Sequence, residues 1–340
     1  MLTVFAVSSF EFSVKDSQHF NLKTFQPLNN TKMLSRVADN IFWMSRYMER
    51  TNVQLRILRT YYIASQDGVP FVKWDDVYSY YNHGKAPEKT MNANEVLQFI
   101  LFDKNNDSSV ANNIFRAREN ARSAQDHITK ELWQCLNDYY HLIRDTGLQK
   151  QVFAGDPVTI IDQLIRQCML YYGVVDVSMF RSEGFNYLSI GKFIERLLQS
   201  ITALKMQISR TNGLSSDSMD IVSWRYFLVS ISGYEYYLKE NSGSVKPDLI
   251  FKQVLYEMHF PHSIAYGLNQ VNRYAQRLKS VSLDESFNKI EFAIGKASAI
   301  LKYNSPGADT EAQVGLLETV EDNILNVIQC LNQYYFGITS

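Results

Sequence analysis

Apolar residues recur at spacings of three and four along most of the chain from Met33 onward, which is the repeat of one helix face. The first such segment spans residues 34–64 and stops at "SQDGVP", where Gly and Pro interrupt it. Its main apolar stripe runs through Met44 and Met48, and Phe42 and Val53 lie nearly opposite. A helix that is apolar on several sides belongs in the middle of a bundle.

Later segments with the same period predict further helices. Polar connections or connections with Gly and Pro join them, and the longest connection spans residues 65–92. The predicted helices span residues 93–102, 110–142 (one helix of about nine turns), 157–172, 182–208, 215–240, 247–258, 261–279 and 309–336, with 282–303 as another candidate. Clear alternating strand patterns are absent after residue 33. We therefore predict an all-α fold, a single large bundle of about eight to ten helices.

The first 32 residues have a different pattern. They contain the alternating stretch "FEFSV", which could form a strand, and a short apolar start without the basic region of a signal peptide. We interpret residues 1–32 as an N-terminal extension, strand-like or disordered, and residues 33–340 as the helical domain. A translation start assigned too early would look the same.

Two segments of the sequence are similar to each other. "NIFWMSRYMER" (residues 40–50) aligns with "NYLSIGKFIER" (residues 186–196), so that Glu49-Arg50 corresponds to Glu195-Arg196. The alignment suggests two weakly related halves that meet in one core.

Charge and cysteine content narrow the classes of function. The chain has 34 basic and 35 acidic residues, which does not favour a nucleic-acid binder. No apolar run approaches the ~20 residues of a membrane span. Its three cysteines have neither metal-ligand spacing nor a disulfide pattern, so we expect a cytoplasmic protein without metal or cofactor.

Several charged residues lie among the apolar positions of the predicted helices. Arg46 and Glu49 share a stripe and could pair at i, i+3, whereas Arg50 points about 100° away from Glu49 and needs an acceptor on another helix. An isolated buried ion is very costly, so burial requires a partner. A second group, "RARENAR", holds Arg118, Glu119 and Arg122.

Three interpretations of these charges remain open. They could form an internal salt-bridge network that sets the register of the helices. Some guanidinium groups could instead face a cleft and bind a carboxylate or phosphate, for which the planar fork of Arg is suited. They could also be a solvated surface. A general acid or base role for Glu49 or Glu195 also stays open, because burial can raise a carboxyl pKa.

Common catalytic signatures are missing from the sequence. There is no Gly-rich phosphate loop, no H-E-x-x-H and no G-x-S-x-G. No Glu has a His three residues later, as a di-iron bundle would require. We assign no catalytic residue from the sequence.

Three segments together resemble the bacterial alpha-E domain family. They are "MLSRVADNIFWMSRYMERTNVQLRIL", "ARENARSAQDHITKELWQCLN" and "RSEGFNYLSIGKFIERLL". "SWRYFLVSISGYEYY" and "FPHSIAYGL" fit as well, and the resemblance covers about residues 33 to 338. One departure is His262, where the family pattern leads us to expect Arg, so an anion-binding role for this corner is in doubt.

The resemblance implies an all-helical domain with a repeated Glu-Arg motif. It also implies a place beside an ATP-grasp-type ligase and transglutaminase-like proteins in a peptide synthesis or modification system, with no established reaction. We expect either a helical partner or scaffold of the ligase, or an enzyme whose Arg/Glu-lined cleft acts on a peptide or amino-acid-like acid. The motif residues implied by position, candidates for anion binding, are Arg46, Glu49, Arg50, Arg118, Glu119, Asn120, Arg122, Arg181, Glu183, Glu195 and Arg196.

Overall fold

The computed structural model describes residues 33–69, 73–82, 84–211, 213–214, 217–241, 244–304 and 309–338. The part from Met33 onward forms one compact unit. These described residues contain fourteen α-helices and no strand, which confirms the all-α prediction. The interpretation of residues 1–32 as an extension lies outside the described residues.

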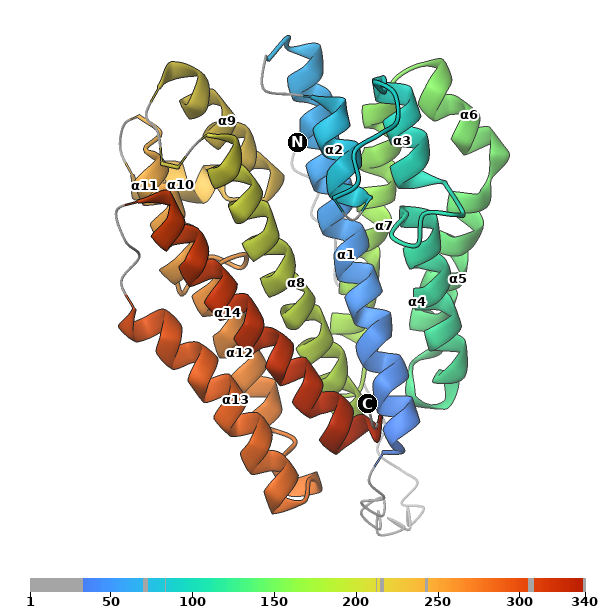
Figure 1. Cartoon of the computed structure of the whole chain (residues 1–340). Helices are drawn as coiled ribbons and strands as arrows, with labels where there is room; N and C mark the ends of the chain where they lie inside the picture. Colours follow the sequence, from blue (N-terminus) through green and yellow to red (C-terminus); the bar gives the residue numbers. More distant parts are fainter. Residues whose placement is uncertain are drawn as a thin grey trace, which may run out of the picture. The chain divides into compact units, whose positions relative to one another are not determined.

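Two long helices, α1 (Ser35–Gln66) and α8 (Glu183–Arg210), lie side by side at the centre of the bundle (Figure 1). Both are buried on several faces, as the sequence predicted for the first of them. The helices that pack on α1 include α4 (Val110–Ser123) and α7 (Pro157–Ser178). Those that pack on α8 include α12 (Ile264–Gln276) and α14 (Thr310–Leu331).

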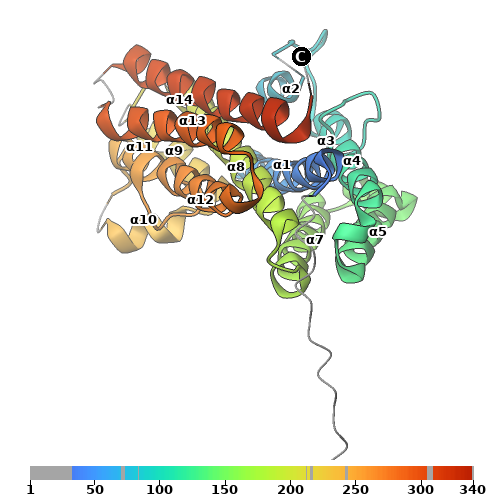
Figure 2. The same ribbon diagram turned by 90° about the horizontal axis from the view of Figure 1, so that it is seen from below.

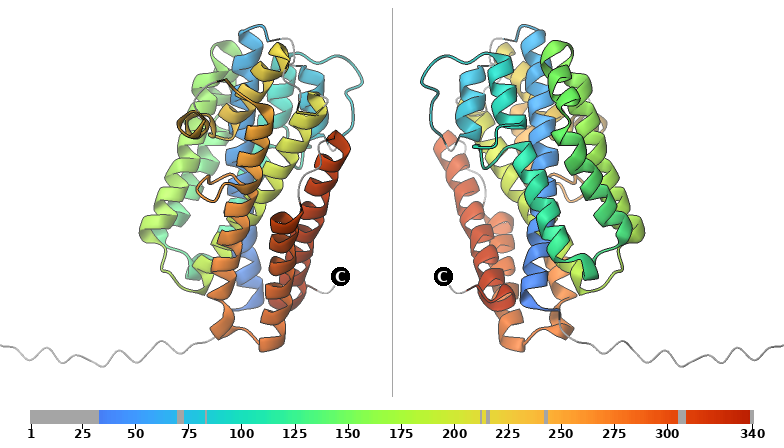
Figure 3. Two further views of the ribbon diagram at one scale, coloured as in Figure 1. Left: turned by 90° about the vertical axis from the view of Figure 1, so that its left-hand side faces the viewer. Right: turned by 90° about the vertical axis from the view of Figure 1, so that its right-hand side faces the viewer.

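Shorter helices complete the two sides of the bundle, as the side views show (Figure 3). On the side of α4 and α7 these are α2 (Trp74–Tyr81), α3 (Ala93–Leu101), α5 (Lys130–Arg144) and α6 (Thr146–Ala154). On the side of α12 and α14 these are α9 (Ser218–Ser230), α10 (Tyr234–Glu240), α11 (Pro247–Tyr256) and α13 (Asp284–Tyr303). Two 3₁₀ turns (Gln125–His127 and Lys279–Val281) and a π-helical turn (Asn332–Phe336) add short irregular pieces.

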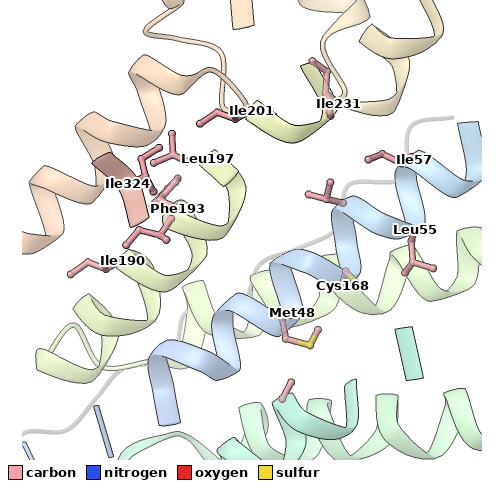
Figure 4. Close-up of a cluster of buried hydrophobic side chains, with 14 of the residues drawn as sticks. Met48, Leu55, Ile57, Cys168, Ile190, Phe193, Leu197, Ile201, Ile231 and Ile324 are labelled. Atoms are coloured by element: carbon pink, nitrogen blue, oxygen red, sulfur yellow. The ribbon is translucent and has the colours of Figure 1, made fainter. Parts of the chain in front are cut away.

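The apolar core is continuous across both sides of the central pair. Figure 4 shows some of its members, including Met48 and Leu55 on α1, Ile190 and Leu197 on α8, and Ile324 on α14. Each of these five side chains is buried. Burying a side chain of this size contributes roughly 1.5–3 kcal/mol, so the core holds the two sides of the bundle together.

The predicted number of helices was too low, in part because two predicted helices are each divided. The segment 110–142 breaks after Ser123, and Thr129 caps α5 by accepting a hydrogen bond from the backbone N–H of Leu132. Its apolar spacing continues across the break because α4 and α5 face the same core. The segment 215–240 breaks at Ser232, whose φ is 56°.

The short helices α2 and α6 were not predicted. Helix α2 lies in the segment that the sequence indicated as a connection, and α6 lies between two predicted helices. Helix α2 buries one apolar residue and α6 buries two, which is too few for a clear apolar period, whereas the equally short α3 buries four and was predicted.

Candidate functional site

The two Glu-Arg pairs bind each other reciprocally across α1 and α8. Glu49 on α1 accepts two hydrogen bonds from Arg196 on α8, from Nε to Oε1 at 2.6 Å and from Nη2 to Oε2 at 3.0 Å. Arg50 donates to Glu195 in the same manner, from Nε to Oε1 at 2.7 Å and from Nη2 to Oε2 at 3.1 Å. Each acid is therefore held by the base of the other motif, in the fork geometry that makes such pairs strong.

The close approach of the two helices explains this pairing. A Cβ added to Gly191 would lie closer than 3.0 Å to both the Phe42 carbonyl oxygen and Ser45 Oγ. Ser45 is four residues before Glu49, and Gly191 is four residues before Glu195, so each acid lies one turn beyond the contact. The absence of a side chain at residue 191 lets the backbones approach, and this brings the charged side chains within reach.

Glu195 has two further partners. Arg46 Nε donates to Oε2 at 2.9 Å, and Gln199 Nε2 donates to Oε1 at 3.0 Å. Burial opposes the charged form of Glu195, but Arg50 and Arg46 outweigh it and lower the pKa to about 2. Arg46 thus pairs with Glu195 on α8, so the predicted i, i+3 pair with Glu49 was wrong, since the interhelical acceptor lies closer. The predicted need of Arg50 for an acceptor on another helix is confirmed.

Glu49 is bound on its other side by a tyrosine. The hydroxyl of Tyr172, on α7, donates to Glu49 Oε2 at 2.5 Å. Burial raises the pKa of Glu49, but Arg196 and the Tyr172 hydroxyl outweigh this effect and leave it below its ordinary value. Burial and the Glu49 charge raise the pKa of Tyr172. Glu49 is therefore ionised and Tyr172 neutral at pH 7, which places α7 in the same network as α1 and α8.

Two basic side chains lie near the Glu49–Arg196 pair without forming an ion pair within the described part of the chain. Burial and the Arg196 charge lower the pKa of His262 to about 3 and that of Lys192 to about 8. The Lys192 ammonium lies 4.6 Å from the ring centroid of Phe193. His262, the departure from the expected Arg, is thus a neutral imidazole at pH 7 and adds no positive charge to this corner.

The Arg50–Glu195 pair borders a pocket of about 330 Å³. The Arg50 side chain is 25% exposed, and Tyr81 Oη is buried there without a hydrogen-bond partner. The lining residues are mostly polar and come from α1, α2, α8 and the segment before α4: Arg50, Gln54, Tyr80, Tyr81, Ser108, Gln199 and Thr202. Sequence reasoning missed this pocket because α2 was not predicted, although "YSYY" gathers hydroxyl groups there.

The candidates of "RARENAR", Arg118, Glu119 and Arg122, bind one another and α5 rather than the α1–α8 ion pairs. Arg118 donates to Asn137 on α5 and to Glu119, both at 2.8 Å, and its guanidinium lies 4.6 Å from the Tyr140 ring centroid. Arg122 is exposed and pairs with Glu119, and Asn120 lies half-buried on the same helix. Arg118 connects α4 with α5. Arg116 of the same stretch lies over Tyr47 on α1, 5.9 Å from the ring centroid, and the Arg50 guanidinium lies 5.6 Å from that centroid.

The remaining two candidates lie where α7 leads into α8. Arg181 Nη2 binds Asp176 Oδ1 at 2.7 Å. Glu183 Oε2 accepts from the backbone N–H of Met33 at 3.0 Å, and Glu183 Oε1 accepts from the Tyr187 hydroxyl at 3.3 Å. Glu183 therefore connects the start of α8 with the start of the described chain.

The described residues contain neither a metal-binding cluster nor a membrane-spanning helix. No three His, Cys, Asp or Glu side chains there come together in a group that could hold a metal ion. None of the helices described combines the length and the apolar character needed to cross a membrane.

Comparison with known proteins identifies a family with the same dipeptide. Residues 33–336 match the Alpha-E family, which is described as a predicted alpha-helical domain with a conserved ER motif. Neither the curated proteins nor the solved structures gave a match. The sequence contains two Glu-Arg dipeptides, at residues 49–50 and 195–196, and they are the two that bind each other. Because the match covers most of its length, the chain belongs to the Alpha-E family.

Proposed function

We propose that this protein is a non-catalytic helical partner, or scaffold, of an ATP-grasp-type ligase in a peptide synthesis or modification system. The Glu-Arg pairs would act by fixing the relative position of α1 and α8, and with it the surface that the bundle presents to the ligase. The link to the ligase comes from the family resemblance. The non-catalytic role is argued from the contacts of the two acids.

The observation that carries the proposal is that both motif acids are fully engaged inside the protein. Glu49 and Glu195 are 0% and 1% exposed, and each has both carboxylate oxygens bound by the arginine of the other motif. Their pKa values are lowered by these arginines despite burial. A general acid or base near neutral pH needs a carboxyl pKa that is raised toward 7. The shifts have the opposite sign, which favours a structural role.

Copurification tests the partnership. The full chain and the ATP-grasp-type ligase encoded nearest to it are produced together, with a tag on the ligase only, and analysed by size exclusion at low salt. We expect the two chains to elute as one complex. An ATP-grasp ligase from an unrelated gene neighbourhood is the control for non-specific binding. Separate elution of the two chains at high concentration contradicts the proposal.

A second candidate function is an enzyme that acts on a peptide or amino-acid-like acid, and the pocket beside Arg50 favours it. Arg carries five N–H groups, of which Arg50 uses two for Glu195, so others can reach a ligand. The unpartnered Tyr81 hydroxyl lies in the same pocket. A substrate carboxylate bound there would complete the hydrogen bonds of both groups.

Turnover assays on the copurified system separate the two functions. Under the enzyme hypothesis, Tyr81→Phe removes a substrate contact and lowers turnover while the thermal midpoint stays close to that of the wild type. Under the partner hypothesis, Tyr81→Phe leaves both turnover and complex formation unchanged. Tyr80→Phe in the same pocket is the matched control.

A further inference from the structure

A second, larger cleft lies at the end of the bundle where α7 meets α8 and α12. Its volume is about 660 Å³, twice that of the pocket beside Arg50. In the end-on view, α8 lies between α7 and α12 (Figure 2). The lining includes Asp176 on α7, four residues at the start of α8 (Ser182, Glu183, Phe185 and Asn186), and Arg273 and Tyr274 on α12 with Arg277 directly after it. The cleft is large enough for a small organic ligand, since ligand pockets usually have volumes of about 300–1,000 Å³.

Two arginines in the cleft have no carboxylate partner. Arg273 and Arg277 are one helical turn apart, exposed, and form no ion pair with any described residue. Their guanidinium carbons lie 5.8 and 5.1 Å from the ring centroid of Tyr274, which stands between them in sequence. Arg181 is neutralised by Asp176, and both oxygens of Glu183 already accept hydrogen bonds. Glu183 keeps its negative charge because its two donors are neutral, so the charged residues that line the cleft, three arginines against Asp176 and Glu183, have a net charge of +1.

The start of α8 adds donors on the same side. This helix has 28 residues, and no side chain caps its first turn at Ser182. Ser182 and Glu183 both line the cleft, so the positive end of the helix faces it. The exposed N-terminus of a long helix attracts anions through its unbonded N–H groups.

The buried side-chain amide of Asn186 favours an anion that can also donate a hydrogen bond. Asn186 lines the cleft and is 6% exposed, and its Oδ1 is buried without a hydrogen-bond partner. A buried acceptor that stays unsatisfied is costly, so a ligand that offers a donor here is favoured. Sulfate and carboxylate ions have no donor at neutral pH. A phosphate monoester has a second pKa near 6, so about half of it carries a P–OH group beside its charged oxygens at pH 6, and about a tenth at pH 7.

We propose that this cleft binds a small organic phosphate. Arg273 and Arg277 bind the charged oxygens, and Asn186 accepts from the P–OH group. Phe185 and Tyr274, whose ring centroids are 5.9 Å apart, pack against the organic part. The site is separate from the proposed ligase partnership, because no residue of the α1–α8 ion pairs lines it.

Calorimetric titration of the full chain at pH 6 tests the site with phenyl phosphate, inorganic phosphate and sulfate as probes. We expect phenyl phosphate to bind most tightly and sulfate most weakly. If inorganic phosphate binds as tightly as phenyl phosphate, the site recognises the phosphate group alone, and this result contradicts the organic part of the proposal. Equal affinity for phosphate and sulfate contradicts the role of Asn186. No heat from phenyl phosphate at millimolar concentration overturns the proposal as a whole.

Matched variants separate a defined site from general attraction to positive charge. The double variant Arg273→Gln/Arg277→Gln should weaken phenyl phosphate binding about tenfold or more, since it removes two charge-assisted contacts. The double variant Arg166→Gln/Arg225→Gln removes the same charge from two exposed arginines outside the cleft and should change affinity less than about twofold. Equal losses in the two variants contradict the site. All four positions are exposed, so thermal midpoints should match the wild type.

Discussion

Glu49 on α1 and Arg196 on α8 bind each other through two parallel hydrogen bonds, although 147 positions separate them in the sequence. One position away, Arg50 and Glu195 form the mirrored pair. The four side chains link the two central helices at a single level of the bundle. A buried pair of this kind gives little net stability compared with apolar residues, but the loss of one member leaves an uncompensated charge. On the structural role proposed above, the motif acts mainly on the register of α1 against α8.

Replacing Gly191 tests the close approach on which the pairing depends. Gly191→Ala should destabilise the protein by about 1–3 kcal/mol, because its methyl group forces the helix backbones apart. Chemical unfolding measures the loss. The control is Gly295→Ala on α13, where an added Cβ meets no atom within 4 Å, and where alanine should stabilise the helix by up to about 1 kcal/mol. A stabilised Gly191→Ala protein would show that the close approach is not required.

Removing the charge of Glu49 tests whether the network is structural. Glu49→Gln leaves Arg196 buried without its counter-charge, and we expect a loss of roughly 3–5 kcal/mol in the free energy of unfolding. Glu119→Gln breaks a partly exposed pair on α4 and should cost less than about 1 kcal/mol. Urea titration at pH 7 compares the two variants. An unchanged stability of Glu49→Gln would refute the structural role.

Acid should weaken the fold through Glu195. Its pKa is about 2 in the folded protein and near 4.5 when unfolded, so the unfolded chain binds its proton first as the pH falls. The stabilisation is complete above about pH 5 and is lost between about pH 5 and pH 2, and a shift of this size corresponds to about 3 kcal/mol. Unfolding free energies measured across this range should fall less steeply in Glu195→Gln than in the wild type. Parallel curves would contradict the low pKa.

His262 should make the free energy of unfolding depend on pH at higher pH values than Glu195 does. Burial and Arg196 lower its pKa from 6.5 to about 3, so the imidazole stays neutral in the folded protein while the unfolded chain takes up a proton below pH 6.5. Its contribution to stability is present above pH 6.5 and decreases as the pH falls toward 3. His262→Gln should flatten the stability curve between pH 6.5 and 5, whereas replacing the exposed His141 by Gln should not. Identical slopes in all three proteins would exclude this role.

The sequence predicted the central elements because their patterns are long. A segment of about thirty residues that is apolar on several sides identified α1, and the similarity between residues 40–50 and 186–196 pointed to its counterpart α8. The need of Arg50 for an interhelical acceptor followed from helix geometry alone. These inferences depend only on the spacing of residues within one helix.

The partners of the charges could not be predicted, because they depend on the register between helices. Arg46 could pair with Glu49 on its own helix or with Glu195 on α8. The close approach of the two helices at Gly191 brings Glu195 within hydrogen-bond distance of Arg46. Tyr172 comes from a third helix and has no sequence signal that ties it to Glu49. The cleft near Arg273 was missed for the same reason, since its walls come from three separate segments.

A double-mutant cycle between Glu49 and Arg196 tests the central claim most directly. The variants Glu49→Gln, Arg196→Gln and the double variant are compared with the wild type by urea unfolding at pH 7. If the two side chains act as one buried unit, the double variant loses much less stability than the sum of the single losses, with an interaction energy of about 1–3 kcal/mol. Single losses that simply add up would contradict the reciprocal pairing of the two motifs.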